Sequence, residues 1–385
     1  MLKIGLSLVC FVFLVSCSSE DKTVYDGGVK LQKVSFASLN EWNKDNLGDG
    51  FDKAIKDVCL HINNKNDEFL GEGDIRIPLK EYKIHCENIL KIKDHNKLKE
   101  YIYNNFEPYK VIYNNCDEGR FTSYYEADVR VSYKKDEKYK YPIYGKPVDL
   151  IEINLQELDS SLPNKRLVGR VEKGKIVKYY TRKEIEEKNI NAPVILWGDD
   201  LVDIHIMQIQ GAAVGELPDG SKIRIGYADN NGHKFRGIGS ILLEKKILES
   251  GKYSMDNIRE WLRENKSLAK ENMQLNDRFI FHKIVEADGP IGAMGLPLVA
   301  GRSMAVDRDF IPLGAMIWLE TAAPNGAKIN KLVMAQDIGG AIKGAIRGDY
   351  FWGSGEEAFI NAGKMNSKGK YYLMLPKKIE VKINE

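Results

Sequence analysis

Two aspartates bracket a glycine-rich loop near the C-terminus of this 385-residue chain. Asp337 follows an apolar segment, and Asp349 precedes the aromatic run Tyr350-Phe351-Trp352. Apolar surroundings disfavour the charged form of a carboxyl group, so Asp349 is suited to remain protonated and act as a general acid. The plainer interpretation is that acidic residues beside glycines cap turns and bind backbone N–H groups. Spacing alone does not separate the two interpretations.

A third aspartate, Asp307, lies upstream at the end of Gly301–Asp307. The elements that must position these three residues read as short strands, which we expect near 315–319, 332–335, 371–375 and 379–383. Their linkers are dense in glycine, which supplies positive φ angles and close backbone approach. The pattern therefore predicts a small barrel with tight crossings.

The middle of the chain, about 121–281, is also rich in short β-branched or aromatic segments. We expect strands near 129–131, 141–144, 150–153 and 204–208. Pro218-Asp219-Gly220 has the composition of a hairpin turn, and an apolar stripe through Ile258, Trp261 and Leu262 predicts a closing helix. Helices are also expected near 40–60 and 98–106, where no chemistry is visible.

Several further blocks carry a resemblance to a known family. Phe121–Glu126 reads F-T-S-Y-Y-E, Tyr141–Tyr144 reads Y-P-I-Y, and Gln208–Gly211 reads Q-I-Q-G. Together with Leu217–Gly220 and the three aspartate segments, they resemble in order and spacing the membrane-bound lytic transglycosylase A family, whose "3D" domain is named for three aspartates. The resemblance covers roughly residues 36–376.

The resemblance implies an α+β, β-rich fold. Residues 35–120 and 282–385 would form a double-psi β-barrel (3D) domain combined with N-terminal helices. Residues 121–281 would form an inserted second β-barrel-like domain, with a groove between the two domains for several sugars of a glycan strand.

The family's lytic transglycosylases cleave the β-1,4 bond between N-acetylmuramic acid and N-acetylglucosamine of peptidoglycan without water, leaving a 1,6-anhydro ring. Hydrolytic glycosidases usually need two carboxylates. Here the C6 hydroxyl of the sugar attacks C1 and is already tethered. One carboxyl can therefore serve first as the acid and then as the base.

Family alignment gives roles to individual residues. Asp349 matches the catalytic acid, Asp337 its positioning neighbour in the catalytic pair, and Asp307 a structural residue. Substrate-binding positions that match groove blocks are Thr122, Tyr124, Tyr125, Gln208 and Gln210. Lys343 and Arg347 would pair with muramyl lactate or peptide carboxylates, or they are solvated loop charges.

Two other functions remain open. A hydrolytic muramidase would need a second carboxylate, for which Asp337 is available. A non-catalytic peptidoglycan-binding lipoprotein would fit the barrel, since fold alone does not fix function.

The N-terminus predicts the compartment. Lys3 and the apolar run 4–15 are typical of a signal peptide and too short to span a bilayer comfortably. Leu14-Val15-Ser16-Cys17 resembles the bacterial lipobox. We therefore expect a signal peptide over 1–17, a lipid on Cys17 and a tether over 18–34. Ser18 resembles the sorting pattern for the outer membrane, which would place the protein in the periplasm, anchored to that membrane's inner leaflet.

Charge and cysteines limit the partners. The net charge is +2, from 57 basic and 55 acidic residues, and gives no indication of nucleic-acid binding. Peptidoglycan strands are the expected partner, with murein synthases and amidases as candidates. An oxidising periplasm permits a Cys59–Cys86 disulfide, leaving Cys116 over. No metal spacing or organic cofactor is implied.

Overall fold

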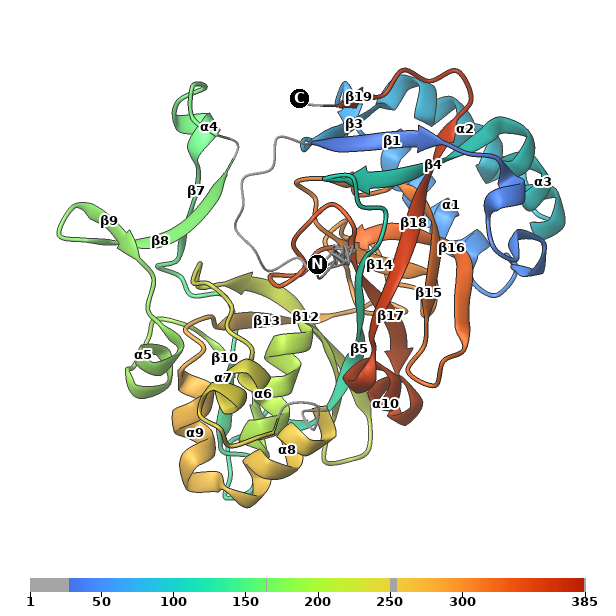
Figure 1. Ribbon diagram of the computed structural model, residues 1–385. Helices are drawn as coiled ribbons and strands as arrows, with labels where there is room; N and C mark the ends of the chain where they lie inside the picture. The colour runs from blue at the N-terminus through green and yellow to red at the C-terminus, as the bar shows by residue number, and fades with distance from the viewer. Residues whose placement is uncertain (1–27, 164, 250–254, 384–385) are drawn as a thin grey trace, which may run out of the picture.

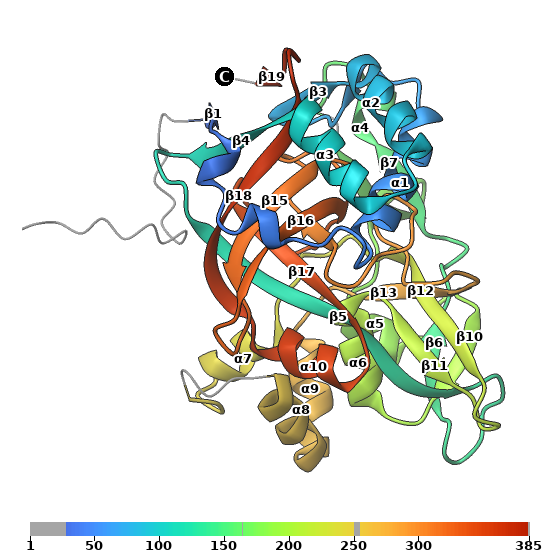
Figure 2. The ribbon, with the colours of Figure 1, turned by 90° about the vertical axis from the view of Figure 1, so that its right-hand side faces the viewer.

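One long strand, β5 (Gly119–Ser132), belongs to both halves of a mixed α/β, strand-rich fold (Figure 1). The computed structural model describes residues 28–163, 165–249 and 255–383. We call residues 28–125 and 286–383 the terminal half, because both ends of the chain build it, and residues 126–285 the central half. Figure 2 shows β5 running between the two halves.

Strand pairing in the terminal half closes on itself. The ring is β5, β17 (Arg347–Ser354), β14 (Ser303–Val306), β16 (Lys328–Asp337), β15 (Met316–Ala322), β18 (Asn366–Pro376) and β5 again. A large core of buried side chains, among them Trp318 and Leu332, fills this half. The strands expected near 315–319, 332–335 and 371–375 are confirmed. The one expected over 379–383 is reduced to β19 (Lys382–Ile383).

Helices and short strands from the N-terminus pack on this half. They are α1 (Phe51–Asn63), α2 (Leu79–Lys91), α3 (His95–Asn105), β1 (Val29–Lys33), β2 (Phe69–Leu70), β3 (Ile75–Pro78) and β4 (Phe106–Tyr113). The helix expected near 98–106 is confirmed. The one expected over 40–60 begins only at Phe51, after the 3₁₀ turns η1 (Phe36–Ser38) and η2 (Trp42–Lys44).

One expectation for the N-terminal region needs correction, and another is confirmed. The tether expected over 18–34 is too long, because Val29–Lys33 pair with β4 and Val29 is buried. The expected disulfide Cys59–Cys86 is present and joins α1 to α2, with 4.9 Å between the Cα atoms. Cys116 lies outside this disulfide and forms an isolated β-bridge with Tyr113.

The central half surrounds a second core. Its strands are β6 (Tyr141–Tyr144), β10 (Val194–Gly198), β11 (Ala213–Glu216), β12 (Lys222–Asn230), β13 (Ile280–Val285) and a separate small sheet of β7 (Ile151–Asn154), β8 (Arg166–Glu172) and β9 (Lys175–Lys178). Its helices are α4 (Leu155–Leu158), α5 (Arg182–Glu187), α7 (Ile238–Glu244), α8 (Met255–Glu264) and α9 (Lys266–Gln274). From the terminal half, α10 (Glu356–Lys364) packs against this second core. The hairpin expected at 218–220 joins β11 to β12, and Gly220 takes the positive φ of +82° that the turn needs.

One expected strand is a helix. Residues 204–208 lie inside α6 (Leu201–Gln210), which begins where the Asp200 side chain accepts hydrogen bonds from the N–H groups of Val202 and Asp203. Residues Val202–Gln208 are all buried. A helix that is enclosed on every side has no polar stripe, so its sequence reads like a buried strand.

The membrane anchor predicted from the sequence falls outside the described part of the chain. Residues 1–17, with Cys17, and residues 18–27 of the tether are not among the described residues. Within the described ranges, no helix has the length and apolar character needed to cross a membrane.

Candidate active site

Asp337 and Asp349 lie on the two strands that flank β14. In the β-sheet register, Asp337 on β16 and Asp349 on β17 are both opposite Ala305. Because neighbouring strands are about 4.8 Å apart, the two backbones are separated by roughly 10 Å. The pair expected from the sequence is therefore brought together.

Thr122 on β5 supports Asp349 from the other side of β17. The two residues are register partners in the parallel pairing of β5 with β17. The Thr122 hydroxyl donates a hydrogen bond to Asp349 Oδ1. Asp349 Oδ2 has no hydrogen-bond partner among the described residues, and Asp349 is partly exposed. One carboxyl oxygen is thus fixed and the other is available.

Arg347 orients the Thr122 hydroxyl. Its Nη2 donates to Thr122 Oγ1 at 2.7 Å, while Nη1 donates to the carbonyl oxygens of Gly348 at 2.6 Å and Arg120 at 3.1 Å. With its oxygen already accepting from Arg347, the hydroxyl proton points to Asp349. Arg347, expected to contact substrate, is therefore already part of an internal chain of hydrogen bonds.

Asp337 is bonded through both of its oxygens. Oδ1 accepts from the backbone N–H groups of Ala293 and Ile338, each at 2.9 Å, and Oδ2 accepts from the Tyr124 hydroxyl at 2.9 Å. The loop carrying Ala293 has no signal in the sequence that links it to this site. Tyr124 also packs against Phe351, with ring centroids 5.1 Å apart.

Burial shifts the pKa of both carboxyls in the same direction. It raises the pKa of Asp349 above its ordinary value, against the opposing effects of the Thr122 hydrogen bond and the Arg347 charge. Burial also raises the pKa of Asp337, to about 6; its hydrogen bonds oppose the shift, and the nearby Asp349 charge adds to it. Both carboxyls therefore keep their protons to a higher pH than an ordinary aspartic acid does.

Asp307 holds the loop that connects the two site aspartates. It is buried and accepts from the Gly344 N–H at 2.8 Å and from Lys343 Nζ at 3.0 Å. Lys343 also pairs with Asp309 at 3.3 Å. Lys343 therefore already has two carboxylate partners, while most of its side chain is exposed.

The remaining predicted groove residues make contacts within the protein. Gln208 is buried, and its amide oxygen accepts from Arg182 Nη1 at 2.5 Å. The amide oxygen of Gln210 accepts from the backbone N–H of Tyr125 at 3.2 Å, and the Tyr125 side chain is buried. The Gln208 contact fastens α6 to α5, and the Gln210 contact fastens α6 to β5.

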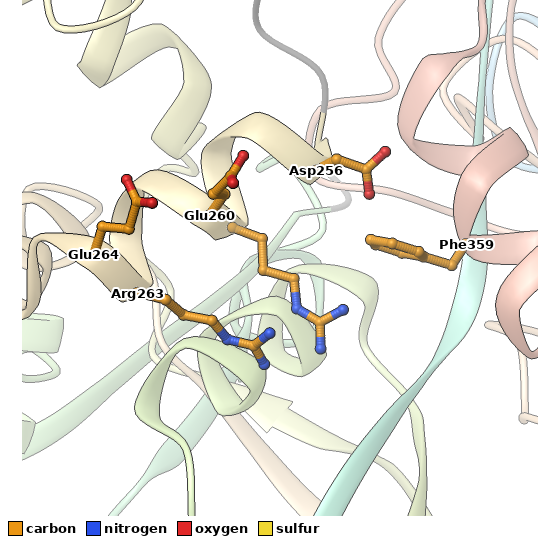
Figure 3. Close-up of a pocket in the computed structure, with 6 residues that line it drawn as sticks. Asp256, Glu260, Arg263, Glu264 and Phe359 are labelled. Carbon is orange, nitrogen blue, oxygen red and sulfur yellow. The ribbon is translucent and has the colours of Figure 1, made fainter.

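A separate charged depression of about 430 Å³ lies on α8, against Phe359 of α10 (Figure 3). Of the arginines that line it, Arg259 donates to Asp203, and Arg263 donates to both Asp200 and Asp203. These ion pairs join α8 to α6, so the arginines serve packing. Among the described residues, no cluster of histidine, cysteine or acidic side chains is arranged to hold a metal ion.

Comparisons with known proteins place the chain in a family. Residues 120–283 match the MltA specific insert domain, and residues 302–375 match the 3D domain. Membrane-bound lytic murein transglycosylase A of Escherichia coli K12 is 31% identical over 265 residues, or 66% of this chain. The match spans 65% of the length of that curated relative.

Solved structures extend the similarity over nearly the whole chain. MltA from Neisseria gonorrhoeae is 30% identical with a TM-score of 0.79, covering 94% of this chain and 96% of its own. A membrane-bound lytic murein transglycosylase from Agrobacterium tumefaciens is 29% identical with a TM-score of 0.79, covering 91% and 98%. The shared sequence, the two matched domains and the shared fold establish that this chain belongs to the MltA family of lytic murein transglycosylases.

Proposed function

We propose that the protein is a lytic transglycosylase that cleaves the β-1,4 bond between N-acetylmuramic acid and N-acetylglucosamine in peptidoglycan. The products would carry a 1,6-anhydro ring, and Asp349 would be the single acid and base. The observation that carries the proposal is the contrast between the two carboxyls. Asp349 has one accessible oxygen and a raised pKa, whereas both oxygens of Asp337 already accept hydrogen bonds.

A single carboxyl can both donate and take back the proton that the reaction needs. Protonated Asp349 gives its proton to the glycosidic oxygen as the bond from that oxygen to C1 breaks. The C6 hydroxyl of the muramyl sugar then bonds to C1, and its proton returns to the Asp349 carboxylate. No water enters, and Asp349 ends the cycle protonated.

The surrounding residues would act on Asp349 rather than on the reacting bond. Thr122 and Arg347 fix one oxygen of the acid, so the other faces the substrate. Asp337 holds Tyr124 and the Ala293 loop in place, which makes it a positioning residue. Asp307 is structural, since it fixes the connecting loop.

Gln208, Gln210 and Tyr125 would shape the substrate groove through packing. Gln208 joins α6 to α5, and Gln210 joins α6 to Tyr125 of β5, next to Tyr124 and three residues from Thr122. We propose this in place of direct sugar contacts by their amides.

The wider organisation follows the same proposal. The closed ring of strands would be the double-psi barrel of the 3D domain, and residues 121–281 the inserted domain across a groove. A lipid on Cys17 would anchor the protein to the outer membrane, in keeping with the "membrane-bound" name of the E. coli relative. That organism's MltA has been solved with bound chitohexaose, which supports a glycan strand as the ligand.

Mass spectrometry of digested peptidoglycan tests the proposal. The chain without residues 1–17 keeps every described residue and is compared with Asp349→Asn and with Asp159→Asn, an exposed aspartate outside the site. We expect anhydromuropeptides from the parent chain and from Asp159→Asn, and none from Asp349→Asn.

The rival functions predict other products. Reducing-end muropeptides from the parent chain would make the protein a hydrolase, with Asp337 as the second carboxylate. Binding to peptidoglycan with no product from any of the three proteins would instead support a non-catalytic wall-binding lipoprotein.

A further inference from the structure

Arg278 presents an unoccupied guanidinium edge. Its Nη1 donates to the carbonyl oxygen of His233 at 3.1 Å, which fixes the plane of the group. Nε and Nη2 lie along the other edge and have no hydrogen-bond partner among the described residues, and Arg278 is partly exposed. These two parallel donors are the geometry with which arginine binds a carboxylate through two hydrogen bonds.

No acidic side chain of the described chain neutralises this arginine. Asp229 is the carboxylate whose charge acts on it, but Asp229 already pairs with Lys146 and Arg166, each at 2.7 Å. Burial lowers the pKa of Arg278, although a guanidinium remains charged at any physiological pH. A half-buried cation without a counter-ion is costly, and an anionic ligand would remove that cost.

The open edge lies beside the loop of the candidate active site. A Cβ built on Gly340 would be 3.8 Å from Cζ of Arg278 and 3.7 Å from Cβ of Phe235. Gly340 is three residues after Asp337 in the loop that leads to Asp349. Arg278 therefore reaches from the central half to the catalytic loop of the terminal half.

The other cations of that loop are already engaged. Lys343 pairs with Asp307 and Asp309, and Arg347 donates to Thr122 and to two carbonyl oxygens. A substrate anion that reaches this loop would find its free paired donors on Arg278.

We propose that Arg278 is a carboxylate-binding residue for the muramyl part of the glycan. This inference rests on the proposed function, because it takes peptidoglycan to be the substrate. The carboxylate has two chemical sources, the lactyl group of a muramyl residue without peptide and the acidic groups of a stem peptide. Either would lie against Nε and Nη2 while the sugar chain continues toward Asp349.

Binding to uncut glycan tests the inference without requiring catalysis. In the Asp349→Asn chain, affinity is measured for peptide-free glycan and for peptide-bearing glycan, each with free carboxylates or with carboxylates converted to methylamides. Arg278→Gln removes the charge, and Arg278→Lys keeps the charge but not the paired donors. Arg236→Gln is the matched control, because Arg236 is an exposed arginine that pairs with Glu244 outside the site.

We expect the Asp349→Asn chain to bind at least one of the two glycans about tenfold to a hundredfold more tightly with free carboxylates than as the methylamide. We call this the affinity ratio. Arg278→Gln should abolish that ratio, Arg278→Lys should reduce it, and Arg236→Gln should preserve it. A ratio found with peptide-free glycan identifies the lactyl carboxylate, and one found only with peptide-bearing glycan identifies the stem peptide.

The inference is overturned if Arg278→Gln keeps the ratio, or if the folded Asp349→Asn chain binds free and methylamide forms equally. Failure of the proposed function is separate, since it would appear as missing anhydro products from the parent chain whatever these affinities are.

Discussion

Thr122 donates a hydrogen bond to Asp349 across two parallel strands whose residues are 227 positions apart in the chain. The contact opposes burial, which raises the pKa of the Asp349 carboxyl, because a hydrogen bond to the charged form stabilises it. It also holds one oxygen so that the other faces outward. Thr122 therefore controls both the proton affinity and the direction of the proposed acid.

Replacing Thr122 with valine should separate these two effects. Loss of a hydrogen bond that favours the charged carboxylate raises the pKa of Asp349 further. The proposed acid must be protonated to react, so the alkaline limb of kcat/KM should move to higher pH, by about one unit, while kcat falls about tenfold. A pH profile of anhydromuropeptide release measures both.

Thr122→Ser is the control for that substitution, because it keeps the hydroxyl between Arg347 and Asp349. Its pH profile should match that of the parent chain. A limb that moves to lower pH in Thr122→Val would contradict the assigned role of the hydroxyl.

Asp337 should make the stability of the protein depend on pH. Its pKa is about 6 in the folded chain and near 3.8 when unfolded. A raised pKa means that the folded state holds the proton more tightly. Asp337 therefore destabilises the fold as pH rises from about 4 through 6, by about 3 kcal/mol in all.

The measurement is urea unfolding of the parent chain and Asp337→Asn at pH 4 and pH 7. The free energy of unfolding of the variant minus that of the parent should increase between the two pH values, because only the parent must ionise a buried carboxyl. A difference that is constant with pH, or that decreases, would rule out the raised pKa.

The two aspartates of the candidate site can be recognised in the sequence, but the residues that support them cannot. Asp337 and Asp349 stand out because each adjoins an apolar or aromatic run and glycines, a local pattern that is visible in the sequence itself. The contact of Ala293 with Asp337 and the orientation of Thr122 by Arg347 depend on which strands pair. Such contacts follow from topology, which no local pattern specifies.

The errors have physical causes too. Helix α6 read as a strand because it is buried on all sides. The ion pair of Lys343 with Asp307 could not be predicted, because the two residues are 36 positions apart. Arg278 gave no signal at all. An arginine without an ion pair differs from an ion-paired one only in its neighbours in space, and those of Arg278 come from three separate segments of the chain.

The buried ion pair between Arg302 and Asp45 should be important for stability. Both side chains are almost fully buried, with exposed fractions of 0% and 2%. The Asp45 carboxylate accepts from Nη2 of Arg302 at 2.6 Å and from the backbone N–H of Leu332 at 2.8 Å. Asp45→Ala leaves a buried guanidinium with only part of its partners, so we expect a loss of about 3–5 kcal/mol in the free energy of unfolding.

Asp57→Ala is the comparison for that loss. Asp57 pairs with Lys53 on the surface of α1, and removal of an exposed ion pair costs about 0–1 kcal/mol. Equal losses from Asp45→Ala and Asp57→Ala in urea unfolding would show that the buried pair adds nothing to the attachment of the N-terminal segment.

Gly119 sets how closely β5 approaches β17. A Cβ built on Gly119 would be 1.8 Å from the carbonyl oxygen of Ile346, a backbone atom that no rotamer change can move. Gly119→Ala must therefore push the two segments apart three residues before Thr122 and three residues before Asp349, directly before the pair of Arg120 with Arg347. We expect a loss of about 1–3 kcal/mol in the free energy of unfolding, together with a larger loss of anhydromuropeptide release at a temperature where the variant is folded.

Gly237→Ala is the matched control for Gly119→Ala, since the nearest neighbours of a Cβ at Gly237 are 3.7 Å away and its φ of −65° suits alanine. Full activity in folded Gly119→Ala would mean that the distance between Thr122 and Asp349 does not limit the reaction.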